Sequence, residues 1–198
     1  PAEFIHFGTT SELLALMTKD IGDYEFLDWK EHVLSNTGEK GFASYGTYIG
    51  KEAQIGRGCY LEHSFILGNT SIGEGSIVSS MYLRDAVVPG NVVLHGLLLK
   101  DGGWVARIYG VWDNPKDRFV IGNRFLDEDM ESLREALGSE YMSEGLTENT
   151  TLWDLPLYVP CSTSEEALDM ALLLYRIVKG TADKADQVKW QRMPKLSL

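Results

Sequence analysis

Apolar residues recur at every sixth position through the centre of the chain, from about residue 43 to residue 93. The positions in phase are Ala43, Ile49, Ile55, Leu61, Ile72 and Val78, with Leu67 one residue out of phase. Glycine directly follows the apolar residue at Gly50, Gly56 and Gly73. This period is typical of a hexapeptide parallel β-helix, in which each six-residue side is a short strand plus a corner and three sides close a coil.

The repeat predicts a short stack of coils. About 50 residues at about 18 per coil give about three coils, with aliphatic side chains stacked at a strand spacing of about 4.8 Å. We expect glycine at the corners because its backbone tolerates angles that a side chain forbids. We expect Ala53, Cys59, Phe65 and Ser76 to fill the space beside the stack. The alternative is an antiparallel sheet, since period six contains period two, but the in-phase Ile-Gly pairs favour the β-helix.

Other patterns flank the repeat. Before it, residues 4–7 are predicted as a strand, Thr10-Ser11 as the N-cap of a helix over 12–16, and residues 23–34 as a second helix. After it, residues 87–110 are predicted to form a strand, an Asp-Gly-Gly turn and a second strand.

Helical patterns dominate the C-terminal part. Residues 127–137 are predicted as an acidic amphipathic helix that ends at Gly138. A short helical turn is expected at 151–155, and a strong helix over 165–179 behind a capping box at 162–165. These helices are the candidate cap for one end of the coils, since an open end exposes unpaired backbone.

Composition and charge exclude several classes of partner. The 198 residues include 18 Lys and Arg against 29 Asp and Glu, a net charge of −11, which opposes binding to nucleic acid or to an anionic membrane. No apolar run approaches the roughly 20 residues that span a bilayer, and no signal-peptide pattern opens the chain. We therefore expect a cytoplasmic protein. Cys59 and Cys161 have no CxxC companion, so we expect free thiols and no disulfide.

The sequence contains no phosphate-loop motif, no GxSxG nucleophile motif and no histidine pair at metal-ligand spacing. We therefore predict no catalytic and no metal-binding residue. Two polar clusters are candidates for contact with a sugar or a phosphate, or alternatively for docking against a neighbouring domain or capping the coil. The second cluster is Asp113, Asn114 and Lys116. The first cluster is His95, Lys100, Asp101 and Arg107, with Trp104 near the hairpin tip. The candidate substrate-binding residues from this cluster are His95, Lys100, Trp104 and Arg107.

A succession of motifs resembles one family, the bifunctional L-fucokinase/GDP-fucose pyrophosphorylases. The motifs occur in the same order as in the family. They are FIHFGTTSELL at 4–14, VPG at 88–90, LHGLLLKDGG at 94–103, RIYG at 107–110, DNPK at 113–116 and TLWDLPLY at 151–158. In that family an N-terminal nucleotidyltransferase domain makes GDP-L-fucose from GTP and fucose 1-phosphate, and a C-terminal GHMP-type kinase makes fucose 1-phosphate from L-fucose. A left-handed β-helix lies between the two.

The resemblance implies a fragment from the middle of such a fucose-salvage enzyme, cut on both sides. The chain lacks the glycine-rich GTP loop and the kinase phosphate loop that the family carries. On this basis residues 1–40 are the closing edge of the nucleotidyltransferase domain, 41–123 are the β-helix with its hairpin and loop, and 124–198 are an α-helical cap and connector.

The expected fold is mainly β with α, a short left-handed parallel β-helix with a helical lead-in and a C-terminal helical cap. The resemblance implies a non-catalytic structural and oligomerisation segment, whose partners are the flanking nucleotidyltransferase and kinase domains and further copies of the chain. It implies no cofactor for this segment, and GTP, ATP and Mg²⁺ for the parent enzyme. The rival hypothesis is a stand-alone hexapeptide-repeat acyl- or nucleotidyltransferase with its site between subunits and His63 or His95 as general base. A third is a small sugar-binding module that uses Trp104 and Arg107.

Overall fold

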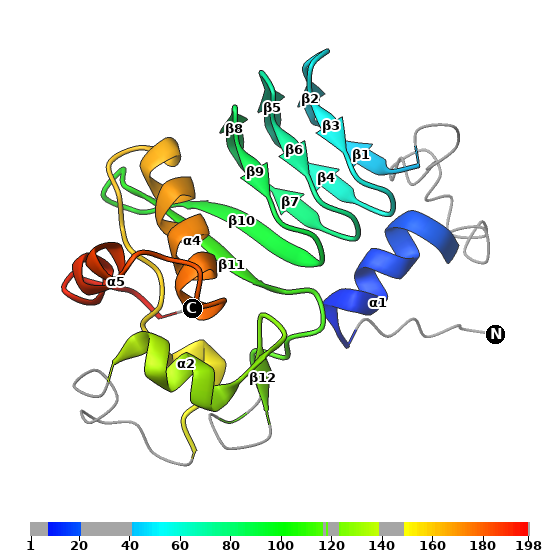
Figure 1. Ribbon diagram of the computed structural model, residues 1–198. Coiled ribbons are helices and arrows are strands. Elements are labelled where there is room, and N and C mark those ends of the chain that lie inside the picture. The colour runs from blue at the N-terminus through cyan, green and yellow to red at the C-terminus, as the bar shows by residue number, and fades with distance from the viewer. Residues whose placement is uncertain (1–7, 21–40, 117, 119–122, 139–148, 198) are drawn as a thin grey trace.

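The computed structural model describes residues 8–20, 41–116, 118, 123–138 and 149–197. Coils of β-strand lead into a long antiparallel hairpin, with helices packed around the hairpin end (Figure 1). The strand predicted at 4–7 and the helix predicted at 23–34 lie outside the described residues.

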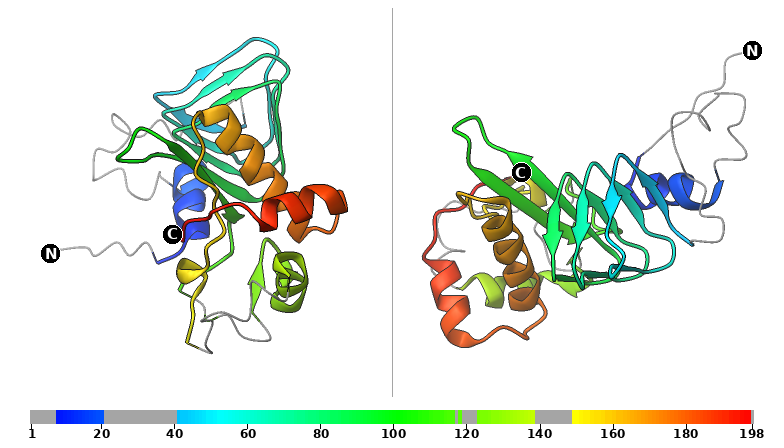
Figure 2. Two further views of the ribbon diagram at one scale, coloured as in Figure 1. Left: turned by 90° about the vertical axis from the view of Figure 1, so that its left-hand side faces the viewer. Right: turned by 90° about the horizontal axis from the view of Figure 1, so that it is seen from above.

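Three sheets of short parallel strands form the predicted β-helix. The first contains β1 (Ala43–Tyr45), β4 (Tyr60–Glu62), β7 (Ile77–Ser79) and β10 (Val92–Leu98). The second contains β2 (Tyr48–Ile49), β5 (Phe65–Leu67) and β8 (Tyr82–Arg84). The third contains β3 (Gln54–Ile55), β6 (Ser71–Ile72) and β9 (Val87–Val88). Seen along the stack, the sheets enclose a roughly triangular interior (Figure 2).

Each coil is shorter than the length of about 18 residues that three six-residue sides predicted. Ala43 pairs with Tyr60, Tyr60 with Ile77, and Ile77 with Val93, which gives coils of 17, 17 and 16 residues. This shortening explains the phase error at Leu67, because the neighbouring Ile66 is the residue that pairs with Ile49 and is fully buried.

The start of the predicted stack also needs correction. Ser44, and not Ala43, is in register with the buried Leu61 and Val78. Ala43 lies on the other face of β1, in an apolar cluster with Tyr60. Because side chains alternate along a strand, a shift of one residue moves a side chain from the interior to the outside of the coil.

Buried hydroxyl groups join successive coils. The Thr70 hydroxyl donates to the Leu67 carbonyl at 2.6 Å and accepts the backbone N–H of Ala86 at 3.3 Å. Ser64 and Ser76 make the same kind of bridge, and all three hydroxyl-bearing residues are buried. Ser64 therefore fills the interior position that we assigned to Phe65, whose side chain is 55% exposed.

Two of the glycines after the isoleucines, Gly56 and Gly73, are required for a different reason than predicted. Gly50, Gly56 and Gly73 do not have a positive φ. A β-carbon on Gly56 would lie 2.5 Å from the Glu74 nitrogen of the next coil. The next coil therefore passes too close for any side chain, whereas the left-handed backbone occurs at other corner glycines such as Gly58.

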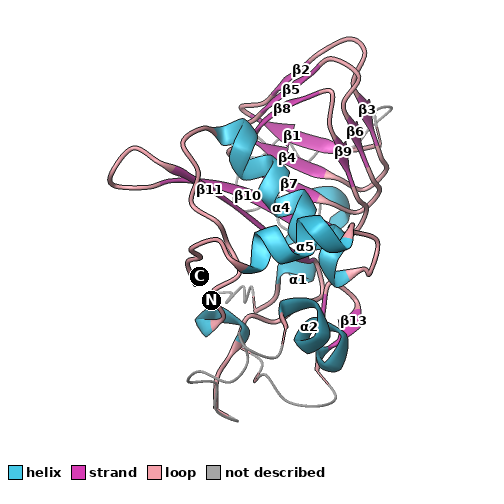
Figure 3. Ribbon diagram, turned by 60° about the vertical axis from the view of Figure 1, so that its left-hand side comes forward, coloured by secondary structure: helices cyan, strands magenta, loops and turns pink. Residues whose placement is uncertain are grey.

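The hairpin and the C-terminal cap are confirmed. β10 pairs antiparallel with β11 (Trp104–Gly110) over its whole length. Helix α4 (Ser164–Val178) packs against β11, β10 and β8 and so closes one end of the stack. It is followed by α5 (Lys184–Gln191), which was not predicted and which buries Trp190. Figure 3 shows α4 and α5 beside the hairpin, with α2 below them.

The remaining elements lie below and beside the coils (Figure 1). The helical lead-in is α1 (Thr10–Ala15), with its capping box at Thr9 and Glu12, and η1 (Leu16–Asp20). The loop after β11 leads to β12 (Arg124–Phe125), β13 (Glu128–Asp129), α2 (Met130–Leu137) and η4 (Leu152–Asp154). In the described part of the chain, every helix is too short or too polar to cross a membrane.

Helix α2 begins three residues later than predicted, although it ends at Gly138 as expected. Leu126 and Asp127 have positive φ values, which are incompatible with a right-handed helix, and form the turn between β12 and β13. The Asp129 carboxylate then caps the helix by accepting the Ser132 backbone N–H at 2.7 Å.

Candidate functional site

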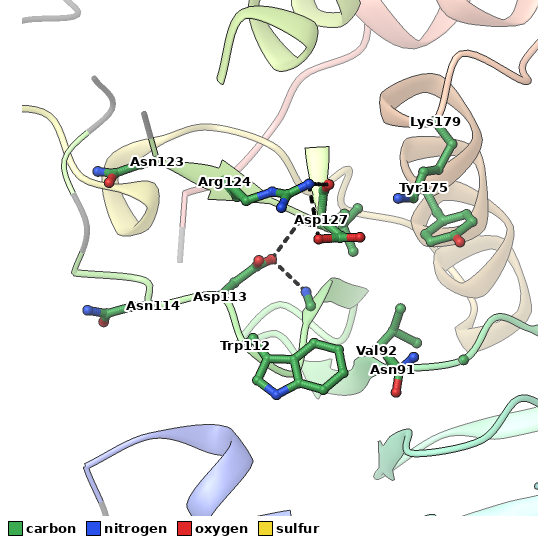
Figure 4. A pocket seen from close by; sticks show the side chains of 13 residues that line it. Asn91, Val92, Trp112, Asp113, Asn114, Asn123, Arg124, Asp127, Tyr175 and Lys179 are labelled. Carbon is green, nitrogen blue, oxygen red and sulfur yellow. Dashed lines mark hydrogen bonds and ion pairs between the residues drawn. The ribbon is translucent and has the colours of Figure 1, made fainter. Parts of the chain in front are cut away.

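A cavity of about 470 Å³ lies where the last coil meets the β12–β13 turn and helix α4 (Figure 4). Its walls come from the coil corner at 90–92, the loop at 110–114, the turn at 123–127, Tyr175 of α4 and Lys179, the C-cap of α4. Small-molecule sites commonly have volumes of about 300–1,000 Å³ and a few convergent polar groups. The cavity therefore has the size of a site for a small ligand.

Asp113 joins two of these walls. Its Oδ2 accepts the backbone N–H of Gly110 at 2.6 Å and that of Leu126 at 2.9 Å. Burial raises the pKa of this carboxyl group, while the two hydrogen bonds favour its charged form. The loop after β11 is thereby held against the β12–β13 turn. Both bonds fall on Oδ2, so Oδ1 has no hydrogen-bond partner among the described residues.

The cations of the cavity are paired with carboxylates. Arg124 Nη2 lies 3.2 Å from Asp127 Oδ1, and Lys179 Nζ lies 2.8 Å from Glu128 Oε1. The second pair is the less exposed and connects α4 to β13. The described lining residues include two carboxylates, Asp113 and Asp127, and two cations, Arg124 and Lys179, so their formal charges sum to zero. No described lining cation is left unpaired for an anionic ligand.

Aromatic and amide groups complete the walls. The Trp112 side chain is 68% exposed and lies along one side of the cavity, near Asn91 and Val92 (Figure 4). The backbone of Asn91, at φ +59°, donates to the Glu74 carbonyl and accepts the Val111 N–H. Trp112 and Asn91 also border a second cavity of about 410 Å³ that reaches to α1.

The four candidate substrate-binding residues of the first cluster lie on different parts of the hairpin. His95 and Arg107 face each other across β10 and β11, and Arg107 Nη2 lies 2.8 Å from His95 Nδ1. Trp104 stands on the opposite face of the hairpin, because side chains alternate along a strand. It is partly buried against the main core, and its backbone pairs with Cys161. Lys100 is exposed in the hairpin turn.

The contact between His95 and Arg107 defines the state of the imidazole. A guanidinium group only donates, so Nδ1 accepts and the proton of the neutral ring lies on Nε2. Burial lowers the pKa of His95, and the positive charge of Arg107 lowers it further. A ring with its acceptor nitrogen occupied in this way does not suit the general base of the rival transferase hypothesis.

His95 and Arg107 belong to a polar row that the sequence did not reveal. Glu62 and Ser79 precede them in the same register across the first sheet. Ser79 Oγ donates to Glu62 Oε1 at 2.6 Å, and the Tyr60 hydroxyl donates to Glu62 Oε2 at 3.1 Å. The row depends on strand pairing alone, so no local motif signals it.

Of the second predicted cluster, Asp113 and Asn114 line the cavity, and Lys116 does not. Four other lining residues were not predicted, because they come from segments that are far apart in the chain and share no motif: Asn91, Trp112, Tyr175 and Lys179. Both cysteines are free, as predicted. Within the described ranges, no three His, Cys, Asp or Glu side chains are grouped to hold a metal ion.

Fold and cavity together define a β-helix protein whose last coil, β12–β13 turn and helix α4 border a cavity of the size of a small ligand. The chain belongs to the fucose pyrophosphorylase domain family, whose family model matches residues 1–163. That span contains the three coils, the hairpin and the loop of Asp113, and it ends where α4 begins. Comparisons with curated proteins and with solved structures found no match.

Proposed function

We propose that this chain is the β-helix segment of a GDP-fucose pyrophosphorylase joined to an L-fucokinase, and that it holds and associates domains without carrying out the chemistry itself. The family match supports the assignment to the pyrophosphorylase. In this proposal the parent enzyme converts L-fucose to fucose 1-phosphate and then to GDP-L-fucose. The flanking nucleotidyltransferase and kinase domains would bind GTP, ATP and Mg²⁺.

A row of three aromatic side chains on the second sheet, two of them exposed and Tyr82 half-buried, carries the proposal of self-association. Tyr48, Phe65 and Tyr82 pair in register on successive coils, with ring centroids 6.5 and 6.3 Å apart. Tyr48 is 59% exposed, and Phe65 more than half exposed. Large apolar groups gathered on a rigid, flat face are typical of protein interfaces, in which aromatic residues are enriched.

We propose a second copy of the chain as the occupant of this face. Strands of a β-helix present a regular surface, and most soluble oligomers are symmetric assemblies of identical chains. Burying the aromatic row against a partner removes apolar area from water, and each Å² so buried contributes about 25 cal/mol.

The test is the mass of the 198-residue chain in solution, measured by sedimentation velocity. We expect a defined oligomer that the double substitution Tyr48→Ser, Phe65→Ser converts to a monomer. The matched control is Val87→Ser, an exposed apolar residue on the third sheet, which should leave the oligomer intact. A monomeric wild-type chain, or an oligomer unaffected by the double substitution, would exclude self-association through this face.

A calorimetric titration tests the non-catalytic part of the proposal. We expect no heat of binding from GTP or from fucose 1-phosphate in the presence of Mg²⁺. Binding of GTP to this chain would place part of the nucleotidyltransferase site here and would overturn the assignment of the segment as a scaffold.

A further inference from the structure

The cavity beside α4 combines features that no motif in the chain explains. The described residues of its lining carry no net formal charge, and the two cations among them are paired with carboxylates. A phosphate group bound here would have to compete with Asp127 for Arg124 and with Glu128 for Lys179. The lining therefore favours an uncharged, polar ligand over a phosphorylated one.

Trp112 provides an apolar surface for such a ligand. Its indole is two-thirds exposed although it lies on a cavity wall, so little of the protein covers it. Ligand pockets are lined mainly by hydrophobic and aromatic side chains, so a large exposed aromatic in a concave site is suited to bind a ligand. The apolar C–H face of a pyranose ring has the shape and polarity to lie flat against it.

Hydrogen-bonding groups stand close to this surface. Asp113 Oδ1 is an acceptor beside the cavity that no described residue donates to, since both backbone bonds of this carboxylate are made by Oδ2. The Asn91 amide offers a donor and an acceptor, and the structure gives its side chain no hydrogen bond within the described residues. Carboxylate and amide groups together match neighbouring hydroxyls, each of which both donates and accepts.

We infer that this cavity binds an uncharged monosaccharide, with its ring against Trp112 and its hydroxyls toward Asp113 and Asn91. The site is distinct from the aromatic row proposed for self-association, which lies on the second sheet. It therefore stands or falls independently of the proposed function. Its ligand differs from the phosphorylated sugar and the nucleotide that a pyrophosphorylase joins.

The experiment is a titration of the 198-residue chain with L-fucose, D-mannose, D-galactose and L-fucose 1-phosphate, followed by the tryptophan indole signals in ¹H–¹⁵N NMR spectra. We expect at least one free sugar to shift the Trp112 indole signal, which is assigned from its loss in Trp112→Ala. Trp112→Ala should weaken the binding at least tenfold. Asn91→Gly keeps the positive φ and removes the amide, and should weaken it about fivefold, the value of one hydrogen bond.

Tyr48→Ala is the matched control, because it removes an exposed aromatic far from the cavity lining. It should leave sugar binding unchanged, and circular dichroism verifies that each variant is folded. The inference is overturned if no free sugar binds, or if Trp112→Ala and Tyr48→Ala bind equally well. It is also overturned if L-fucose 1-phosphate binds more tightly than L-fucose and Lys179→Met removes that preference, since the cavity would then be an anion site.

Discussion

Gly73 lies so close to Gly90 of the next coil that a β-carbon on Gly73 would collide with the Gly90 nitrogen. Gly56 has the same relationship to the Glu74 backbone one coil earlier. At the corner that follows the third sheet, the backbone of one coil is therefore in direct contact with the backbone of the next. At the positions of Gly56 and Gly73 the stack has no room for a side chain.

Replacing Gly73 by alanine should separate the two coils. We expect Gly73→Ala to lower the free energy of unfolding by more than about 2 kcal/mol, because rigid backbone has to move to accept the methyl group. Gly58→Ala is the control, since Gly58 has a φ of +68° but open space around its β-carbon position. It should cost about 1–2 kcal/mol from backbone strain alone. Urea denaturation measures both, and equal costs would contradict the close packing of the coils.

The Thr70 hydroxyl should contribute more to stability than the Thr70 methyl group. Thr70→Val keeps the shape of the side chain but leaves the buried Ala86 N–H without its acceptor. We expect a loss of about 1–3 kcal/mol, the penalty for an unsatisfied buried group. Thr70→Ser retains the hydroxyl and should cost less than Thr70→Val in the same denaturation experiment. The reverse order would show that the interior needs the methyl group instead.

Asp113 should be essential for the wall of the cavity. Asp113→Ala removes the acceptor of two backbone N–H groups, those of Gly110 and Leu126, and both residues are buried. We expect a loss of about 2–4 kcal/mol, at about 1–3 kcal/mol for each unsatisfied donor. Asp113→Asn retains one carbonyl oxygen and avoids the buried charge, so its cost should be at most half as large. Thermal unfolding distinguishes the two variants, and equal melting temperatures would show that the two backbone bonds do not stabilise the loop.

His95 should make the protein less stable in mild acid. Its pKa in the folded chain lies below the ordinary value of 6.5, so the unfolded chain binds more protons as the pH falls below that value. Stability is then lost as the pH falls through about 6.5 and stops falling below the folded pKa, with a slope of at most about 1.4 kcal/mol per pH unit. Protonation also removes the acceptor for Arg107.

The measurement is the free energy of unfolding between about pH 7.5 and pH 5, for the wild type and for His95→Gln. The variant cannot titrate at this position, so its stability should fall less over this range. His63 is exposed at a coil corner, and His63→Gln is the matched control for the loss of one imidazole. If His95→Gln keeps the wild-type slope, His95 does not carry the pH dependence.

The sequence alone determined the architecture where the pattern was local and regular. Ile55 and Ile72, each followed by glycine, indicated a coil, and they pair in register in the third sheet. The Asp-Gly-Gly turn correctly separated the two strands of the hairpin. The apolar face of residues 165–179 predicted α4 almost to the residue. Helix α5 was not predicted, because its sequence is mostly polar and Trp190 is its only buried residue.

The positions of the functional groups were decided only by the tertiary structure. Trp104 was a candidate for contact with a ligand or with a neighbouring domain, and its side chain is partly buried against the core beside Cys161. Trp112, which was no candidate, is the tryptophan left exposed on the cavity wall. Exposure depends on what covers a side chain, and the covering residues lie far away in the chain. The reason for glycine at Gly73 likewise lies in the next coil. A periodic pattern specifies local conformation and the buried face, while a site arises from contacts between distant segments, which only the folded chain brings together.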